Sequence, residues 1–289
     1  MFRLVFTLAL TLLCAGLAAQ EYRFVSAKNG KDVTLEKMAA KLQKYDFVFF
    51  GEWHGNAAIH QAENALLAAL YARDPRLMVS FEMFERDVQS NLDVYLKGDI
   101  EEAEFLAAAR PWPNYATDYR PLVDFAKEHG LVCVAANVPR YLAGKAARSG
   151  AGFEETLSEE ERTFLALQVS APPGAYRDNF LFTMQANGMH GDADNADLYE
   201  HLYYAQCVKD DTMAESILQY RERWPKQRII HFNGDFHSRE FLGTVERVKA
   251  RQPKLKIAVI SPLSVDEKLP ASPEKIATYF VVIAAADEE

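Results

Sequence analysis

Four apolar segments of this 289-residue sequence each end in residues that can carry out chemistry. The segments and the polar residues after them are DFVFF (46–50) before Glu52 and His54, RLMVSFE (76–82) ending on Glu82, GLVCVAAN (130–137) ending on Asn137 with Arg140 close behind, and QRIIHFN (227–233) before His237. Imidazole and carboxylate groups transfer protons, bind metal ions and orient substrates. We therefore predict a functional site where these segments end.

The tetrapeptide pattern Gly-x-x-His occurs directly after two of these segments, as Gly51 to His54 and as Gly234 to His237. Glycine allows the chain to turn tightly off a strand. The histidine three residues later could then point back over the edge of a sheet. One such tetrapeptide is a weak signal, whereas two in equivalent places indicate a shared site.

Two kinds of site fit this set of side chains. His54 and His237, with a carboxylate from Glu52 or Glu82, could hold a divalent metal such as Mn, Co or Zn with open coordination positions, as catalytic metal centres do. The same groups could instead form a hydrogen-bonded anion or substrate site that contains no metal. The sequence leaves both alternatives open.

The elements that position these residues alternate between strands and helices. The four segments, together with KIAVISP (256–262) and ATYFVVIAAA near the C-terminus, are nearly continuous apolar runs, which are typical of parallel strands buried on both faces. Helical segments such as IHQAENALLAALYA and YRPLVDFAKEH lie between them. We expect an α/β fold with a mainly parallel β-sheet flanked by helices. In such sheets, ligands bind beyond the carboxyl ends of the strands.

The strand pattern stops between about residues 144 and 224. This region contains two helical patterns, EETLSEEERTFLAL and a long one that begins at DLYEHLYYAQ, separated by SAPPG and by the Gly- and Asp-rich ANGMHGDADNAD. We predict a smaller all-helical insertion that packs near the mouth of the sheet, within one α/β domain that spans residues 20–289.

The first 19 residues have the order of a secretory signal peptide. Arg3 is followed by an apolar run and then by small residues, so we expect cleavage after Ala19 and export to the periplasm or outer membrane. Cys14 raises the alternative of a lipoprotein, but Thr11 and Leu13 precede it where a lipidation signal has Leu and a small residue. We therefore favour an unlipidated mature chain.

The overall charge excludes one class of function. With a formal net charge of -9, the chain lacks the excess of Lys and Arg that a phosphate-binding surface needs, so we expect no nucleic-acid partner. The mature chain would keep only Cys133 and Cys207, which cannot form a disulfide framework.

Five motifs together resemble the ChaN-like haem-binding proteins, whose superfamily includes the Tiki proteases, TraB-like proteins and erythromycin esterases. They are FFGEWHGNAAIHQ, FEMFERDVQ, AANVPR, YAQCVKDDTMA and NGDFH, and they lie in order over roughly residues 33–262. The resemblance implies an α/β core with a smaller helical sub-domain, export to the envelope, and a role in haem-iron acquisition.

The resemblance also implies a shared pocket. Carried over position by position, it would contain Glu52, His54, His60, Glu82, Asn137, Arg140, Gln206, Asp210 and His237. Gln206, Asp210 and Met213 are spaced so that one helix face can present them to the sheet edge.

Haem needs an axial ligand, apolar walls and cations for its propionates. The stretch between residues 184 and 206 supplies the ligand types, and we rank them Tyr203, Tyr199, Tyr204, His201 and His190. Tyr203 comes first because it lies about one turn from Gln206. Arg140 and Arg177 are the predicted propionate partners.

Two functions therefore remain. The favoured one is an exported haem-binding protein, with an outer-membrane uptake system as a partner and a homodimer as one arrangement. The alternative is a metal-dependent hydrolase of the cell envelope, with a His/His/Glu centre at the carboxyl edge of the sheet.

Overall fold

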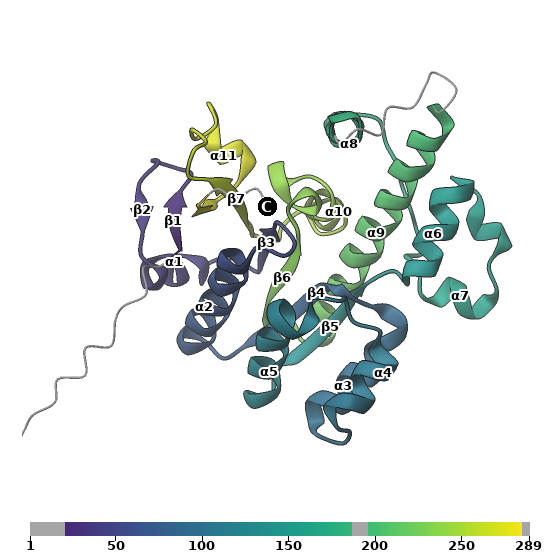
Figure 1. The fold of residues 1–289 in the computed structure, drawn as a ribbon, viewed down its shortest axis with the longest axis horizontal. Helices are drawn as coiled ribbons and strands as arrows, with labels where there is room; N and C mark the ends of the chain where they lie inside the picture. Colours follow the sequence, from purple (N-terminus) through teal and green to yellow (C-terminus); the bar gives the residue numbers. More distant parts are fainter. Residues whose placement is uncertain (1–20, 187–195, 285–289) are drawn as a thin grey trace, which may run out of the picture.

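An eight-stranded β-sheet forms the centre of the protein, and helices cover it (Figure 1). The computed structural model describes residues 21–186 and 196–284. The strands lie in the order β2-β1-β8-β7-β3-β6-β4-β5. Their bounds are β1 Tyr22–Ser26, β2 Asp32–Val33, β3 Phe47–Glu52, β4 Leu77–Glu85, β5 Val132–Asn137, β6 Arg228–Gly234, β7 Ile257–Ser264 and β8 Tyr279–Ile283.

Most of the sheet is parallel. All pairings from β8 through β7, β3, β6 and β4 to β5 are parallel, whereas β1 pairs antiparallel with both β2 and β8. The predicted α/β class with a mainly parallel sheet is confirmed. The helices are α1 Leu35–Leu42, α2 Ala57–Arg73, α3 Gln89–Lys97, α4 Glu102–Ala109, α5 Arg120–Glu128, α6 Arg140–Ser149, α7 Glu159–Thr163, α8 Ala175–Ala186, α9 Ala196–Arg223, α10 Thr244–Arg251 and α11 Pro273–Ile276.

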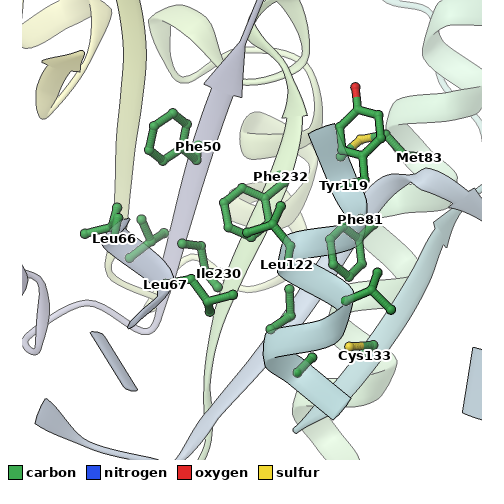
Figure 2. Packing of buried hydrophobic residues seen from close by; sticks show 14 of the residues in the cluster. Phe50, Leu66, Leu67, Phe81, Met83, Tyr119, Leu122, Cys133, Ile230 and Phe232 are labelled. Atoms are coloured by element: carbon green, nitrogen blue, oxygen red, sulfur yellow. The ribbon is translucent and has the colours of Figure 1, made fainter. Parts of the chain in front are cut away.

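The central strand β3 is apolar up to its last residue, Glu52, because both of its faces are covered. Phe47 and Phe49 belong to a core cluster that includes residues of α9 and α10, whereas Val48 and Phe50 belong to a second cluster with residues of α1, α2 and α5. Figure 2 shows the second cluster, in which Phe50 and Phe232 lie on neighbouring strands. Burial of each such side chain stabilises the fold by roughly 1.5–3 kcal/mol. This packing holds the carboxyl ends of β3 and β6 in register.

The long helix α9 connects two parts of the molecule. Near its C-terminal end, Met213 and Ile217 are fully buried in the cluster that covers the sheet. Nearer its N-terminus it runs beside α6 and α8, away from the strands (Figure 1). In the described part of residues 144–224 the chain forms helices and loops. A charged side chain on the middle of α9 can therefore reach the sheet edge.

Several sequence predictions concern residues on which the structure gives no information. The signal peptide of residues 1–19, with Cys14, and the candidate ligand His190 lie outside the described residues.

None of the helices in residues 21–186 and 196–284 combines the length and apolar composition needed to cross a membrane. Cys133 and Cys207 are both buried free thiols.

Candidate functional site

A cavity of about 850 Å³ lies at the carboxyl edge of the sheet. The structure brings seven of the predicted residues to its wall: Glu52, His54, Glu82, Asn137, Arg140, Gln206 and His237. Trp53, Trp112, Lys209, Phe236 and Arg239 complete much of the remaining lining. The cavity is therefore both charged and aromatic.

Glu52 and His54 form a hydrogen-bonded pair at the end of β3. The Nδ1 of His54 lies 2.6 Å from Oε1 of Glu52, which also accepts a 2.7 Å hydrogen bond from the hydroxyl of Tyr119. The ring of His54 packs edge-on against Trp112. Burial alone lowers the pKa of His54, but the hydrogen bond to Glu52 and the charges of Glu82 and Glu52 outweigh it, so the pKa is raised above its ordinary value.

His237 is buried between two carboxylates. Its Nδ1 lies 2.7 Å from Oδ1 of Asp210, and its Nε2 lies 3.3 Å from Oε1 of Glu82. Burial opposes the charged form, but the two carboxylates outweigh that effect and raise the pKa of His237 to about 9. The raised pKa favours the protonated, cationic form of His237 at neutral pH.

The two carboxylates around His237 are held in their charged form by further donors. Asp210 accepts hydrogen bonds from the hydroxyls of Tyr176 (2.5 Å) and Thr244 (2.8 Å), and Glu82 accepts one from the backbone N–H of Gly234 (2.7 Å). Burial raises the pKa of each carboxyl, but the charge and hydrogen bond of His237 outweigh it, so both pKa values are lowered. Arg247 and Tyr176 add to this effect at Asp210, and the charges of His54 and Lys209 add to it at Glu82.

The strand β4 does not end at Glu82, as the sequence suggested, but continues to Glu85. Its register with β5 shifts between Phe81 and Glu85, which is the mark of a β-bulge or similar irregularity. Such irregularities re-aim side chains next to functional sites. Here Glu82 reaches both the N–H of Gly234 and the ring of His237.

The two glycines of the Gly-x-x-His repeats act through their size. Gly234 has ordinary backbone angles (φ −54°), and a Cβ there would lie 2.9 Å from Nε2 of His54. A Cβ on Gly51 would lie 2.5 Å from Oδ1 of Asp235. Without a side chain at these two positions, the ends of β3 and β6 can approach the polar residues that follow each other's strand. The sequence suggested that these glycines allow a tight turn, but the structure shows that they are needed for this close approach.

The haem-ligand candidates lie apart from the wall of this cavity. Tyr203 is buried, packs against Tyr176 and Phe180, and donates a 2.7 Å hydrogen bond to the carbonyl of Pro172. Tyr204 donates to the carboxylate of Glu154. Burial raises the pKa of both phenols.

The remaining candidates lie on α9 and its neighbours. Tyr199 and His201 are partly exposed on the N-terminal half of α9. Arg177 on α8 forms an ion pair with Glu200, and Arg140 forms one with Glu85 at the cavity rim.

Two of the predicted pocket residues, Asp210 and His60, do not line the cavity. Asp210 contacts His237, and His60 lies behind the cavity next to Glu52. His60 is buried, with Nδ1 2.9 Å from Oε2 of Glu63 and Nε2 3.2 Å from Oδ2 of Asp118. Sequence reasoning missed Glu63, Asp118 and Tyr119. The only sequence signal for this group was the spacing of His60 and Glu63, which places both on one face of α2.

Comparisons with known proteins agree with this architecture. A family model described as "Haem-binding uptake, Tiki superfamily, ChaN" matches residues 38–248. The structure of ChaN of Campylobacter jejuni, solved for cofacial haem binding, has a TM-score of 0.73 and 16% identity, over 91% of this chain and 97% of that one. A mutant of the erythromycin esterase EreC has a TM-score of 0.50 and 13% identity, over 93% and 84%. These two similarities concern the fold, and no curated protein sequence matches.

Proposed function

This chain belongs to the ChaN family of haem-binding uptake proteins in the Tiki superfamily, and we propose that it is exported and binds haem as the cargo of haem and iron acquisition. The observation that carries the proposal is a pair of exposed apolar side chains, one on α8 and one on α9. Phe182 on α8 is 73% exposed and Leu198 on α9 is 41% exposed. Large apolar side chains left in water on adjoining elements are suited to cover a flat, apolar ligand.

The helices that carry these two side chains also provide residue types that can ligate haem iron. A phenolate or an imidazole is a common axial ligand of haem iron, and Tyr199 and His201 provide both types on the N-terminal half of α9. The hydroxyl of Tyr203 is already bonded to the carbonyl of Pro172, and that of Tyr204 to Glu154. Because Tyr203 is buried whereas Tyr199 and His201 are partly exposed, we now place Tyr199 and His201 ahead of Tyr203 as ligands.

Absorption spectroscopy with haemin tests this assignment. We expect the purified mature protein to develop a Soret band, and Tyr199→Phe or His201→Gln to change the ferric spectrum. Tyr203→Phe is the matched control, because it removes a hydroxyl from the same helix and should leave the spectrum unchanged. Haem binding that survives every change on α8 and α9 but disappears in His54→Gln would place the haem in the sheet-edge cavity instead.

Export is proposed from the sequence of residues 1–19. Mass analysis of the protein from its native envelope tests this proposal, because an unlipidated mature chain begins near Gln20. A mass that matches a diacylglyceryl group on Cys14 would show a lipoprotein. Cross-linking in the same envelope fraction, with and without haemin, tests for a homodimer and for an outer-membrane partner.

A hydrolase of the cell envelope is the second candidate, and the cavity with its Glu52 and His54 pair favours it. A carboxylate that orients an imidazole is the usual arrangement of a general base. His54 has its Nδ1 bonded to Glu52, and its side chain is 45% exposed. The cationic His237 could stabilise a developing negative charge. Ester hydrolysis that is lost in His54→Gln and depends on added Mn, Co or Zn would support the metal-dependent form predicted from the sequence.

A further inference from the structure

A cluster of ionisable side chains is buried directly behind the sheet-edge cavity. It consists of Glu52 at the end of β3, His60 and Glu63 on α2, and Asp118 in the π-helical turn Tyr115–Tyr119. Each of these residues is less than 9% exposed, and Glu63 is fully buried. His60 lies in the middle, with Nδ1 facing Glu63 and Glu52 and Nε2 facing Asp118.

The cluster has more negative than positive groups. Glu52, Glu63 and Asp118 supply three carboxyl groups, and in the described ranges their ion-pair partners are His54 and His60, with no Lys or Arg among them. Oε2 of Glu52 and Oε1 of Glu63 are buried and have no hydrogen-bond partner. Unpaired carboxylate oxygens in a low-dielectric interior are strongly unfavourable. A positive species is therefore needed between them.

We propose that Glu52, His60 and Glu63 bind a divalent first-row transition-metal ion. One ligand atom from each of the three residues lies within 4.8 Å of the others, the only such convergence of His, Cys, Asp and Glu within residues 21–186 and 196–284. A set of one imidazole and two carboxylates suits ions such as Zn²⁺ or Mn²⁺, and the two carboxylates balance the charge of the ion.

The surrounding residues hold these ligands as outer partners of a metal site usually do. A metal-bound histidine commonly gives its other N–H to a carboxylate. Nε2 of His60 lies 3.2 Å from Asp118, which Asn114 in turn holds with a 2.5 Å hydrogen bond. The second oxygen of Glu52 accepts from Tyr119. Oε2 of Glu52, Oε1 of Glu63 and Nε2 of His60 make no hydrogen bond, whereas Nδ1 of His60 lies 2.9 Å from Oε2 of Glu63.

A shared proton is the competing occupant of the same place. Burial, the charge of Glu52 and a hydrogen bond to Glu52 raise the pKa of Glu63 well above its ordinary value, so the metal-free cluster would keep a proton on Glu63. Metal binding must then release that proton, and it must weaken as the pH falls. Both occupants satisfy the carboxylates, so only a binding measurement separates them.

This site differs from the metal centre predicted from the sequence. That centre used His54 and His237 with Glu52 or Glu82, and the carboxylates beside His237 already receive hydrogen bonds from Tyr176, Thr244 and Gly234. Glu52 belongs to both groups, because its other oxygen contacts Nδ1 of His54 in the cavity. Occupancy of the buried site would therefore fix the hydrogen bond that orients His54. The proposal does not depend on haem binding.

Metal analysis of the haem-free protein tests the proposal. The protein is stripped with a chelator, incubated separately with Zn²⁺ and Mn²⁺, passed through a desalting column and analysed for bound metal and for its melting temperature. We expect about one ion per chain and a higher melting temperature with the ion than without it. Glu63→Gln and His60→Gln should each weaken binding at least tenfold, by about the amount typical for loss of a ligand or its support.

Two controls keep the test decisive. Glu63→Gln removes a charge without changing shape, so the variant should remain folded in the absence of metal while its metal-dependent shift in melting temperature disappears. Glu82→Gln changes the sheet-edge carboxylate and should still bind the ion. Loss of the ion in Glu82→Gln with retention in Glu63→Gln would place the metal at the sheet edge. A folded wild-type chain that binds neither ion would show that the cluster holds a proton.

Discussion

His60 and His237 are both buried imidazoles that lie between carboxylates, yet their surroundings differ. The carboxylates around His237 receive further hydrogen bonds from Tyr176, Thr244 and the backbone of Gly234. Glu63, beside His60, has one oxygen with no partner. The pKa values of Asp210 and Glu82 are lowered, whereas that of Glu63 is raised.

The difference shows that burial alone does not decide whether a carboxyl group is charged. Burial raises the pKa in all three cases, and the balance depends on how many donors and cations reach the oxygens. We call the His237 group the completed network, because hydrogen-bond donors reach both of its carboxylates and His237 is their shared cation. The His60 group is incomplete, and this is why we assign an additional cation to it.

The largest expected effect comes from removing the cation of the completed network. His237→Gln would leave Asp210 and Glu82 buried without their shared positive partner, at a cost of about 3–5 kcal/mol in the free energy of unfolding. Urea unfolding at neutral pH measures it. A loss below roughly 1 kcal/mol, the usual value for an exposed pair, would show that the network is open to solvent.

The pH dependence of stability should show the same network. The pKa of His237 is raised from 6.5 to about 9 in the folded protein, so its contribution is complete below the unfolded value and is lost as the pH rises through the folded one. The free energy of unfolding should fall by roughly 3 kcal/mol between about pH 6.5 and pH 9. The fall should be absent in His237→Gln, and a wild-type curve that is flat over this range would contradict the assignment.

Removing the Tyr176 hydroxyl should leave Asp210 with one hydrogen-bond donor fewer, as Glu63 lacks a donor beside His60. Tyr176→Phe deletes the hydroxyl that donates to Asp210 and keeps the ring that packs on Phe236. We expect a loss of about 1.5–3 kcal/mol in the free energy of unfolding, the usual value for a hydrogen bond to a charged group. Tyr203→Phe, which loses a bond to a neutral carbonyl, is the matched control and should cost about 1 kcal/mol. Equal losses would mean that the charge of Asp210 is unimportant.

The smallest expected effect is an unchanged or slightly higher free energy of unfolding, in contrast to the losses above. In chelator-treated protein the raised pKa of Glu63 favours its neutral form, so Glu63→Gln exchanges one neutral group for another of the same shape beside Glu52. We expect the free energy of unfolding at neutral pH to rise by about 1 kcal/mol or to stay unchanged. A clear loss of stability in the metal-free state would show that the charge of Glu63 is already balanced there.

The carboxyl ends of β3, β5 and β6 and the polar residues there could be predicted from the sequence, because buried parallel strands are continuous apolar runs and a polar residue directly after one is easily seen. The end of β4 was predicted three residues too early. Glu63 could not be predicted, since a carboxylate within a helical pattern is normally a solvent-facing residue and nothing local shows that it is fully buried. The orientation of Tyr203 was also beyond the sequence. Its spacing from Gln206 suggested the cavity, but the packing of Tyr176 and Phe180 directs its ring toward α8.

The pairing order of the strands also has a consequence for the time course of folding. The central strand β3 pairs only with β6 and β7, which come from residues 228–264, and Tyr22 near one end of the described chain pairs with Ile283 near the other. Of the strands in the first 140 residues, only β1 with β2 and β4 with β5 can pair before the rest is available. Such non-local contacts slow folding. The central sheet therefore cannot assemble until nearly the whole chain has been synthesised.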